Sequence, residues 1–329
     1  MRYPVLLVAL SGLVVLLFAA SLLVGPAALG LADSLSALVT GQGEAVVLVM
    51  REIRLPRALL GLMVGAVLGL SGAAMQGYLR NPLAEPGLVG VSSSAALGAV
   101  IALQTGLAAA FTLALPVAAL AGAGLSVLLI LGLAGPRGGA LALILAGVAI
   151  SALAAAGVAL VLNLSPNPFA AMEIVFWMMG SLADRSMTHV ALAAPFVIAG
   201  MALLLTLGRG LDALTLGEDA AEALGVRMSR LRLVLILGTA MSVGAAVAVA
   251  GTVGFVGLVV PHILRPLVGA RPSRLLLASA LGGAAMLLAA DIAVRVIAPD
   301  RDLKLGVLTA IVGSPFFLHL IWRMRRLEA

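Results

Sequence analysis

Apolar residues run along the chain in ten blocks, separated by short charged or Pro- and Gly-rich breaks. Most blocks approach the roughly 20 residues that an α-helix needs to cross the hydrocarbon core of a bilayer. The blocks cover residues 5–24, 57–79, 88–104, 109–134, 140–162, 190–208, 233–251, 255–269, 275–297 and 305–322. The pattern predicts an all-α polytopic membrane protein with about ten transmembrane helices, some of them short or broken.

Composition supports this prediction. The 329 residues are 63% hydrophobic and only 10% charged, with a mean hydropathy of +1.21. A soluble domain of this length carries about a quarter charged residues. The 38 glycines and 4% aromatic residues suit closely packed membrane helices. No polar interruption is long enough for a soluble domain, so residues 1–329 are expected to form one transmembrane domain.

The first apolar block permits two interpretations. Met1-Arg2 followed by an apolar run to Val24 resembles a signal peptide. The run is also long enough to span a bilayer, which favours a retained first helix.

Basic residues predict the orientation, because Lys and Arg concentrate on the cytoplasmic side of membrane proteins. An even number of spans places both termini on one side. If that side is cytoplasmic, the inside set is Arg2, Arg80, Arg137, Arg209, Arg227, Arg230, Arg232, Arg265, Arg271, Arg274, Arg323, Arg325 and Arg326. The smaller outside set is Arg51, Arg54, Arg57, Arg185, Arg295, Arg301 and Lys304. The bias favours cytoplasmic termini.

The sequence lacks the residues that several classes of chemistry require. The absence of cysteine excludes disulfides and thiolate metal sites. Lys304 is the sole lysine, and no G-x-x-x-x-G-K-[ST] loop surrounds it, so a partner would have to supply any ATP-driven motor. No metal-ligand spacing or nucleophile motif indicates an enzyme. The basic residues lack an aromatic platform, so we expect no nucleic-acid partner, and no cofactor or metal is expected on this chain.

Asp291 is the one carboxylate that the apolar blocks contain, and Arg295 follows it by one helical turn. The pair is either a relay or substrate contact, or an intrahelical ion pair near the outer membrane surface, which we favour.

Glycines and one polar stretch add further expectations. Gly61, Gly65, Gly69 and Gly72 form a close-packing face, either within the chain or at a dimer seam. Gly251 to Gly257 predicts a tight re-entrant turn inside the protein. Residues 214–226 predict a short helix with acids in its early turns and Gly225 at its end.

Sequence motifs along nearly the whole chain resemble the permeases of iron-siderophore, haem and vitamin B12 ABC importers. The N-terminal motifs are Arg54-Leu-Pro-Arg57, Ser71-Gly-Ala-Ala-Met75-Gln76 and Arg80-Asn81-Pro82-Leu83-Ala84-Glu85-Pro86-Gly87-Leu-Val-Gly90. The later motifs are Phe176-Trp177-Met-Met-Gly180-Ser181, Leu216-Gly217-Glu218, Leu224-Gly225-Val226, Gly254 to Arg265, Ala290-Asp291-Ile292 and Gly313-Ser-Pro315-Phe316.

The resemblance implies a homodimer of ten-helix subunits in the bacterial inner membrane, with a translocation path along the two-fold axis. Two cytoplasmic ABC ATPase subunits and a periplasmic substrate-binding protein would complete the importer. ATP and magnesium would bind to the ATPase, and this chain would not be an enzyme.

The resemblance also assigns roles to residues. The coupling segment, residues 212–227, would contact the ATPase through Leu216, Gly217, Glu218, Ala221, Leu224 and Gly225. Arg54, Arg57 and Arg295 would dock the binding protein. The cytoplasmic gate would consist of Asn81 and Leu83 with Ala140 and Leu141. The second gate segment, which is polar in the cobalamin member of the family, is the smaller and apolar Gly139-Ala140-Leu141 here.

The implied function is import of an iron chelate, either a ferric siderophore or haem, by alternating access. Cobalamin is the alternative substrate. An ion-coupled secondary transporter is a remote alternative, because the chain lacks the set of intramembrane ionisable groups that coupling requires.

Overall fold

The computed structural model describes residues 2–25, 30, 33–34, 36–37, 44–111, 113–135, 138–298 and 303–328. Arg137 and Arg301, which count toward the charge balance above, lie outside these ranges. The side chains of Arg323, Arg325 and Arg326 also lie outside the description.

The described chain consists almost entirely of helices and contains no strand. The N-terminal half comprises α1 (Tyr3–Leu23), α3 (Glu44–Leu48), the π-helical turn η1 (Val49–Arg54), α4 (Leu55–Leu79), the 3₁₀ turn η2 (Pro86–Val89), α5 (Val91–Gln104), α6 (Leu107–Ala110), α7 (Ala114–Ala134) and α8 (Ala140–Asn163). The remainder comprises α9 (Pro168–Met178), α10 (Met187–Thr206), α11 (Gly208–Leu214), α12 (Glu218–Ala223), α13 (Met228–Ala250), α14 (Val256–Leu264), the 3₁₀ turn η3 (Arg265–Val268), α15 (Pro272–Ile297) and α16 (Leu305–Glu328).

Seven helices of the described chain are long and apolar enough to cross a membrane. They are Tyr3–Leu23, Ala45–Leu79, Ala114–Ala134, Ala140–Asn163, Met187–Thr206, Met228–Ala250 and Pro272–Ile297. The three other predicted blocks correspond to shorter apolar helices, Val91–Gln104, Val256–Val268 and Leu305–Leu320. The all-α polytopic fold is therefore confirmed, including the expectation that some of its helices are short.

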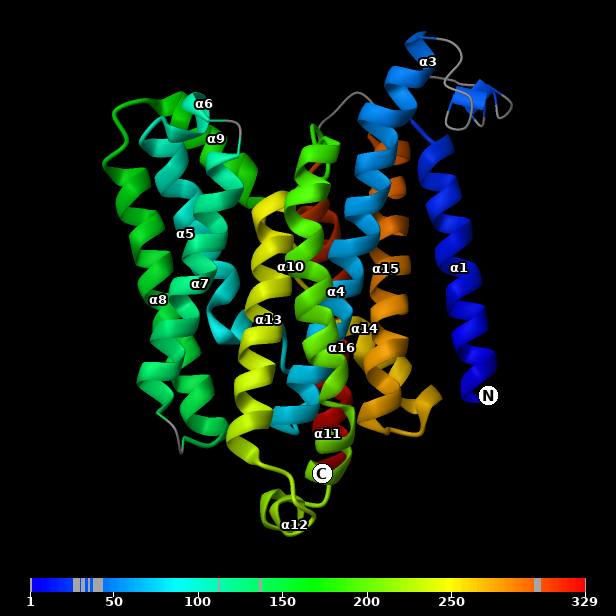
Figure 1. The fold of residues 1–329 in the computed structure, drawn as a ribbon, viewed down its shortest axis with the longest axis vertical. Helices are drawn as coiled ribbons and strands as arrows, with labels where there is room; N and C mark the ends of the chain where they lie inside the picture. Colours follow the sequence, from blue (N-terminus) through cyan, green and yellow to red (C-terminus); the bar gives the residue numbers. More distant parts are fainter. Residues whose placement is uncertain are drawn as a thin grey trace.

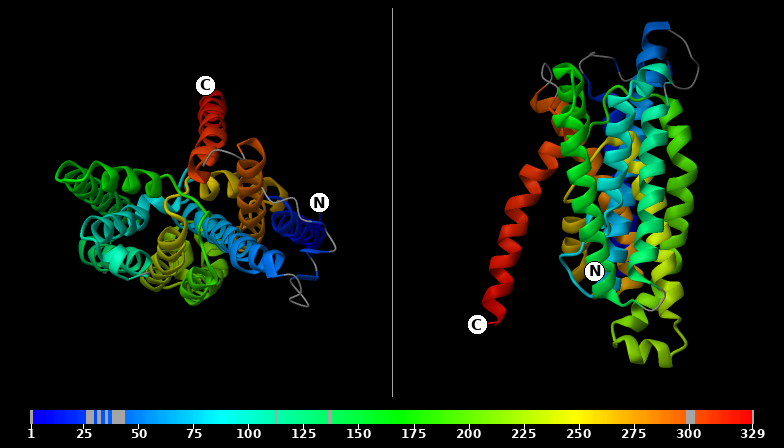
Figure 2. Two further views of the ribbon diagram at one scale, coloured as in Figure 1. Left: turned by 90° about the horizontal axis from the view of Figure 1, so that it is seen from above. Right: turned by 90° about the vertical axis from the view of Figure 1, so that its left-hand side faces the viewer.

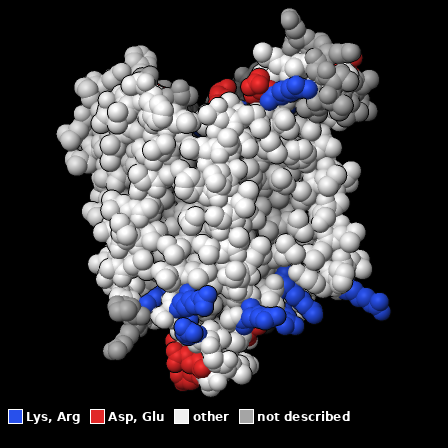
Figure 3. Space-filling model, in the orientation of Figure 1, with Lys and Arg blue, Asp and Glu red and all other residues white. Residues whose placement is uncertain are grey.

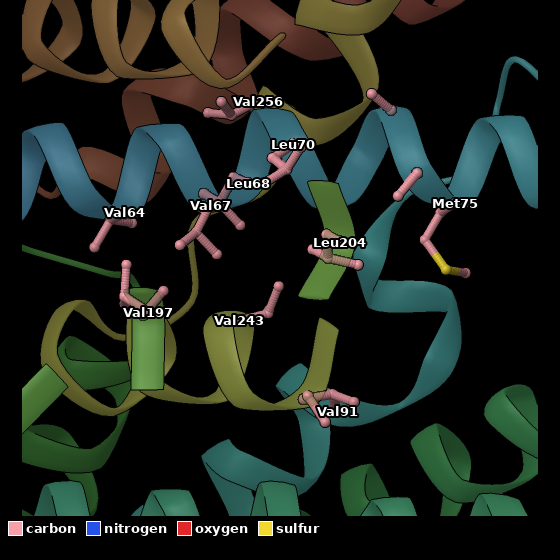
Figure 4. Packing of buried hydrophobic residues seen from close by; sticks show 14 of the residues in the cluster. Val64, Val67, Leu68, Leu70, Met75, Val91, Val197, Leu204, Val243 and Val256 are labelled. Carbon is pink, nitrogen blue, oxygen red and sulfur yellow. The ribbon is translucent and has the colours of Figure 1, made fainter. Parts of the chain in front are cut away.

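The long helices stand side by side in one bundle (Figure 1). The helix that contains α4 and the helix α13 are central, because 78% of the residues in an apolar 18-residue stretch of each are buried. In α1 only 17% of such a stretch is buried, and this helix lies at the edge. Figure 4 shows how the core forms: Val67 of α4, Leu204 of α10 and Val243 of α13 meet between the helices. All three side chains are fully buried.

The glycine face of α4 packs within the chain. A Cβ built on Gly65 would lie 2.4 Å from the carbonyl oxygen of Gly283, and one on Gly69 would lie 2.0 Å from that of Ser279. Both partners belong to α15, whose contact with α4 is the most extensive between helices. Gly72 meets the backbone of Gly257 in the same way. The intra-chain interpretation of this face is confirmed for these positions.

Two short helices begin inside the bundle rather than at its ends. η2 precedes α5 and packs on the middle of α8, where a Cβ on Gly147 would lie 2.0 Å from the carbonyl oxygen of Leu88. Likewise, Gly257 at the start of α14 packs against Gly72, seven residues before the end of α4. Residues 251–255 form the predicted turn between α13 and α14. Both segments are partly buried against neighbouring helices, and the turn at 251–255 also borders a cavity, which is where irregular backbone is tolerated at membrane depth.

Two predicted block boundaries were wrong. The block at 57–79 belongs to a continuous helix over residues 44–79, because a π-turn admits Pro56 without breaking the helix: the N–H of Leu55 reaches back to the carbonyl of Met50. The block at 109–134 is divided, because α6 ends at Ala110 and Phe111 is extended before α7 begins.

The ends of the bundle differ in what they carry. The N-terminus, the C-terminus and α12 lie at one end, which we call the termini end, and α3, α6 and α9 lie at the far end (Figure 1). α16 leans away from the other helices as it approaches the termini end (Figure 2). On the face shown in Figure 3, charged residues lie at both ends and leave an uncharged band between them. This is the charge distribution of a protein that spans a bilayer.

Candidate functional site

Asp291 lies at the centre of an ion cluster that joins α4 to α15 at the far end. The Nε of Arg57 donates to both carboxylate oxygens of Asp291, at 2.9 and 3.1 Å, and its Nη2 lies 2.8 Å from Oδ1. The Nη2 of Arg295 lies 2.9 Å from Oδ2. The side chain of Asp291 is 1% exposed. The favoured intrahelical pair is present, and Arg57 extends it to a second helix.

Two of the three predicted docking arginines also cap α1. Arg54 donates to the carbonyls of Leu22 and Leu23, at 3.0 and 2.9 Å. Arg295 donates to the carbonyls of Ser21 and Val24, at 2.9 and 2.6 Å. The last carbonyls of a helix lack partners within that helix and carry partial negative charge, so guanidinium donors stabilise them.

These contacts leave the three arginines unequally accessible. Arg54 is 4% exposed, and the side chain of Arg295 is 6% exposed, whereas that of Arg57 is 18% exposed. In this conformation Arg57 is thus the member of the set that a protein at the far end reaches most easily. A role in docking stays a prediction for all three.

The predicted coupling segment, residues 212–227, forms α11's last turn, α12 and their flanking turns at the termini end. α12 starts after Gly217 and gives way to Gly225, both of which have positive φ. Leu216 and Leu224 are 69% and 65% exposed, and Ala221 is fully buried. Glu218 and Asp219 occupy its first turn, where the helix dipole favours acids. The predicted short helix is therefore present.

Asp212 anchors the beginning of the coupling segment to α15. Its carboxylate accepts hydrogen bonds from the backbone N–H of Ser273 (2.8 Å), from the Ser273 hydroxyl (2.7 Å) and from Arg271 (2.8 Å). Burial alone would raise the pKa of Asp212, but the hydrogen bonds from Ser273 and Arg271 lower it below its ordinary value. The carboxylate thus caps the first turn of α15.

The two predicted gate segments lie beside the coupling segment. Asn81 is exposed, and its side-chain oxygen accepts a hydrogen bond from the N–H of Leu83 at 2.9 Å. Ala140 and Leu141 begin α8, and Leu141 is 69% exposed.

A cavity of about 700 Å³ brings these regions together. Its lining includes Tyr78 from the end of α4, Gly138 and Gly139 directly before α8, and Glu218 and Glu222 from α12. The predicted coupling segment therefore faces the same space as residues that directly precede the predicted gate positions on α8 and that lie three residues before Asn81.

A second cavity, of about 640 Å³, opens between α9, the 251–255 turn and α16. Met178, Met179, Val307 and Pro315 make its lining mainly apolar, and Phe255 joins them from the turn. Phe255 has a φ of +68°, which is rare for an aromatic residue and marks a constrained position.

Sequence reasoning missed two residues that the fold places centrally. Glu85 is half-buried in the irregular segment between α4 and α5, where the backbone N–H of Phe255 interacts with its carboxyl group. Arg232 was counted only as a topology signal, yet it is buried and bonds the end of α7. Neither position stands out along the chain, because their partners are distant in sequence.

Metal binding finds no support in the residues that the structure describes. They contain no group of three or more His, Cys, Asp or Glu placed to hold an ion.

Comparison with known proteins places the chain in a family. Residues 13–323 match the model of the FecCD transport family. The chain is 40% identical over 290 residues to the hemin transport system permease protein HmuU of Yersinia pestis, covering 87% of this chain and 86% of that one. It is 41% identical over 278 residues to the Fe(3+) dicitrate transport system permease protein FecD of Escherichia coli K12, covering 84% and 86%.

Two further similarities cover nearly the full length. The vitamin B12 import system permease protein BtuC of Salmonella paratyphi A is 38% identical over 323 residues, covering 97% of this chain and 95% of that one. A solved structure described as an inward-facing conformation of a metal-chelate type ABC transporter superposes with a TM-score of 0.86 at 34% identity, covering 97% and 99%. The chain belongs to the FecCD transport family and is a multi-pass permease subunit of an ABC importer, in which a separate ATPase hydrolyses ATP.

Proposed function

We propose that this permease imports an iron chelate, haem or a ferric siderophore, into the cytoplasm by alternating access. The observation that carries the proposal is about 40% identity, over most of both chains, to permeases named for hemin and for ferric dicitrate. The apolar cavity beside Met178, Met179 and Phe255 supports it, because a metal enclosed by its own ligands needs few polar contacts. Cobalamin is the alternative substrate, on 38–40% identity to permeases named for cobalamin and vitamin B12.

The proposed assembly is a homodimer with two ATPase subunits and a periplasmic binding protein, in a bacterial inner membrane. We place both termini and the coupling segment on the cytoplasmic side. Two observations support this orientation: both termini share one end with α12 (Figure 1), and the basic residues are more numerous there by the sequence count.

Alternating access assigns a task to each region. ATP binding and hydrolysis in the partner would move α12 through the exposed Leu216 and Leu224. That motion would open or close the passage at Asn81, Leu83, Ala140 and Leu141. An apolar constriction at Ala140 and Leu141 closes by excluding water rather than by charge.

Uptake by proteoliposomes tests the function. The permease is reconstituted with its ATPase and binding protein, and haemin, ferric citrate and cobalamin are offered separately. We expect ATP-dependent accumulation of an iron chelate. Accumulation of cobalamin alone would support the alternative substrate, and uptake without the ATPase would contradict the importer mechanism.

Charge reversal tests the docking proposal at its most accessible member. Arg57→Glu is expected to weaken binding-protein association by at least tenfold, because arginines dock most favourably onto acidic groups, which a glutamate at this position would repel. Arg2→Glu, at the opposite end of the bundle, is the matched control. Unchanged association of the folded Arg57→Glu variant would contradict the assignment, and recovery with a binding protein of reversed charge would support it.

A further inference from the structure

Arg232 connects the coupling segment to the end of α7, the helix that precedes the predicted gate residues of α8. It lies one turn inside α13, and α13 begins one residue after the coupling segment ends at Arg227. Its Nη2 donates to the carbonyl oxygen of Gly135 at 2.8 Å. Gly135 is the C-cap of α7, and α8 starts five residues later at Ala140.

The position of this hydrogen bond matters because open space separates the regions around it. The cavity of about 700 Å³ lies between α12 and residues Gly138 and Gly139, and Arg232 forms part of its wall. Tyr78, at the end of α4 and three residues before Asn81, lines the same cavity as Arg232 and Glu218. Arg232 therefore crosses from the coupling side to the gate side.

The surrounding geometry makes this connection stiff. Val226 donates its N–H to the carbonyl of Ala221 (3.0 Å), and Gly225 donates to that of Glu222 (2.8 Å), which fixes the turn between α12 and α13. Arg232 is 6% exposed, so its side chain has little freedom. A guanidinium is a rigid planar donor, and the end of α7 presents carbonyls that need donors.

We propose that Arg232 is a positioning residue that transmits movement of the coupling segment to the start of α8, by holding the Gly135 carbonyl. This inference rests on the proposed importer function and extends it to a specific mechanical contact. Displacement of α12 would carry the first turn of α13 with it, and Arg232 would draw Gly135, at the end of α7, in the same direction.

Transport per ATP separates this role from simple stabilisation of the fold. The wild type, Arg232→Met, Arg232→Lys and Arg230→Met are each reconstituted with the ATPase and binding protein. Arg230 is the matched control because it is exposed on the same turn of α13. Three quantities are measured: the ATPase retained by the permease, the ATP hydrolysed, and the haemin or ferric citrate accumulated, whichever the wild type takes up.

We expect Arg232→Met to retain the ATPase and hydrolyse ATP within about twofold of the wild type, while accumulating at least tenfold less substrate per ATP. Arg232→Lys should keep at least half of the wild-type ratio, since an ammonium group still donates to a carbonyl. Arg230→Met should behave as the wild type.

Several results would overturn the inference. One is that Arg232→Met accumulates as much substrate per ATP as the wild type. Another is that Arg230→Met loses as much transport per ATP as Arg232→Met, and a third is that Arg232→Lys does. If Arg232→Met does not reach the membrane, Arg232→Gln replaces it with the same expectation, and absence of both would show a structural role instead. Failure of the wild type to accumulate any substrate would instead contradict the proposed function.

Discussion

At the residue scale, buried arginines of this chain bond the carbonyls at helix ends. Arg54 and Arg295 bond the end of α1, and Arg232 bonds the end of α7. Arg185 bonds the carbonyl of Val249 at the end of α13. A helix end inside a bilayer cannot use water to satisfy its carbonyls, so a long cationic donor is an effective substitute.

Removal of the Asp291 charge tests the ion cluster. Asp291→Asn leaves Arg57 and Arg295 beside each other without their shared counter-ion, and we expect a loss of about 3–5 kcal/mol. Thermal unfolding of the detergent-solubilised protein measures it. Glu222→Gln, at an exposed carboxylate, should leave the unfolding temperature unchanged. An equally small effect at Asp291 would show that the cluster contributes little to stability.

The anchor at Asp212 predicts a dependence of stability on pH. The folded state holds the pKa of Asp212 below its ordinary value, so this carboxylate stabilises the fold above the unfolded-state pKa of about 4. The contribution is lost as the pH falls through the lower, folded-state pKa.

We therefore expect Asp212→Asn to cost about 1 kcal/mol at pH 7, by weakening the cap of α15. The difference from the wild type should shrink as the pH is lowered below about 4. Unfolding measured across this range checks the direction, and Ser273→Ala should reproduce part of the neutral-pH loss. A difference that grows toward acid pH would contradict the assignment.

At the element scale, glycines determine how closely α4 approaches its neighbours. Gly65→Ala would place a Cβ 2.4 Å from one backbone oxygen of α15 and 2.8 Å from the Cα of Ala284. Because backbone atoms cannot rotate aside, the two helices must separate, at an expected cost of about 1–3 kcal/mol.

Gly124→Ala in α7 provides the matched comparison for that substitution. A Cβ at Gly124 meets no atom within 4 Å. Alanine there should stabilise the helix by about 0.5–1 kcal/mol, since glycine is the poorer helix former. A lower unfolding temperature for Gly65→Ala and a higher one for Gly124→Ala would support close packing as the cause. A change in the same direction for both variants would refute it.

At the scale of the whole molecule, α16 is the helix least integrated into the bundle. It leans away from the other helices (Figure 2), and Ile311 and Leu318 are 62% and 67% exposed on it. A second copy of the chain, as proposed above, would cover these side chains.

Cysteine cross-linking tests that arrangement directly, because the chain has no native cysteine. Leu318→Cys is expected to give a disulfide-linked dimer in membranes under mild oxidation. Val8→Cys on α1, which is 74% exposed at the edge of the bundle, should remain monomeric on a denaturing gel. The reverse pattern would place the interface elsewhere.

Apolar run length predicted the helices because the bilayer requires about 20 apolar residues per span. Apolar run length was less informative where protein rather than lipid surrounds a helix. α5 and α14 begin inside the bundle, and the length of their apolar runs does not indicate how deep in the bundle they begin. The block at 57–79 began too late, because the π-turn that accommodates Pro56 depends on backbone bonding rather than composition.

The sequence by itself determined that the chain is a polytopic membrane protein, since composition and run length follow from the solvent alone, and its motifs indicated the permease family by resemblance. It also located the short helix on which coupling is predicted, because Gly217, Gly225 and the early acids act locally. Only the tertiary structure decided the surroundings of Asp291, Glu85 and Arg232. Their partners lie on other helices, and contacts between distant segments leave no periodic signal along the chain.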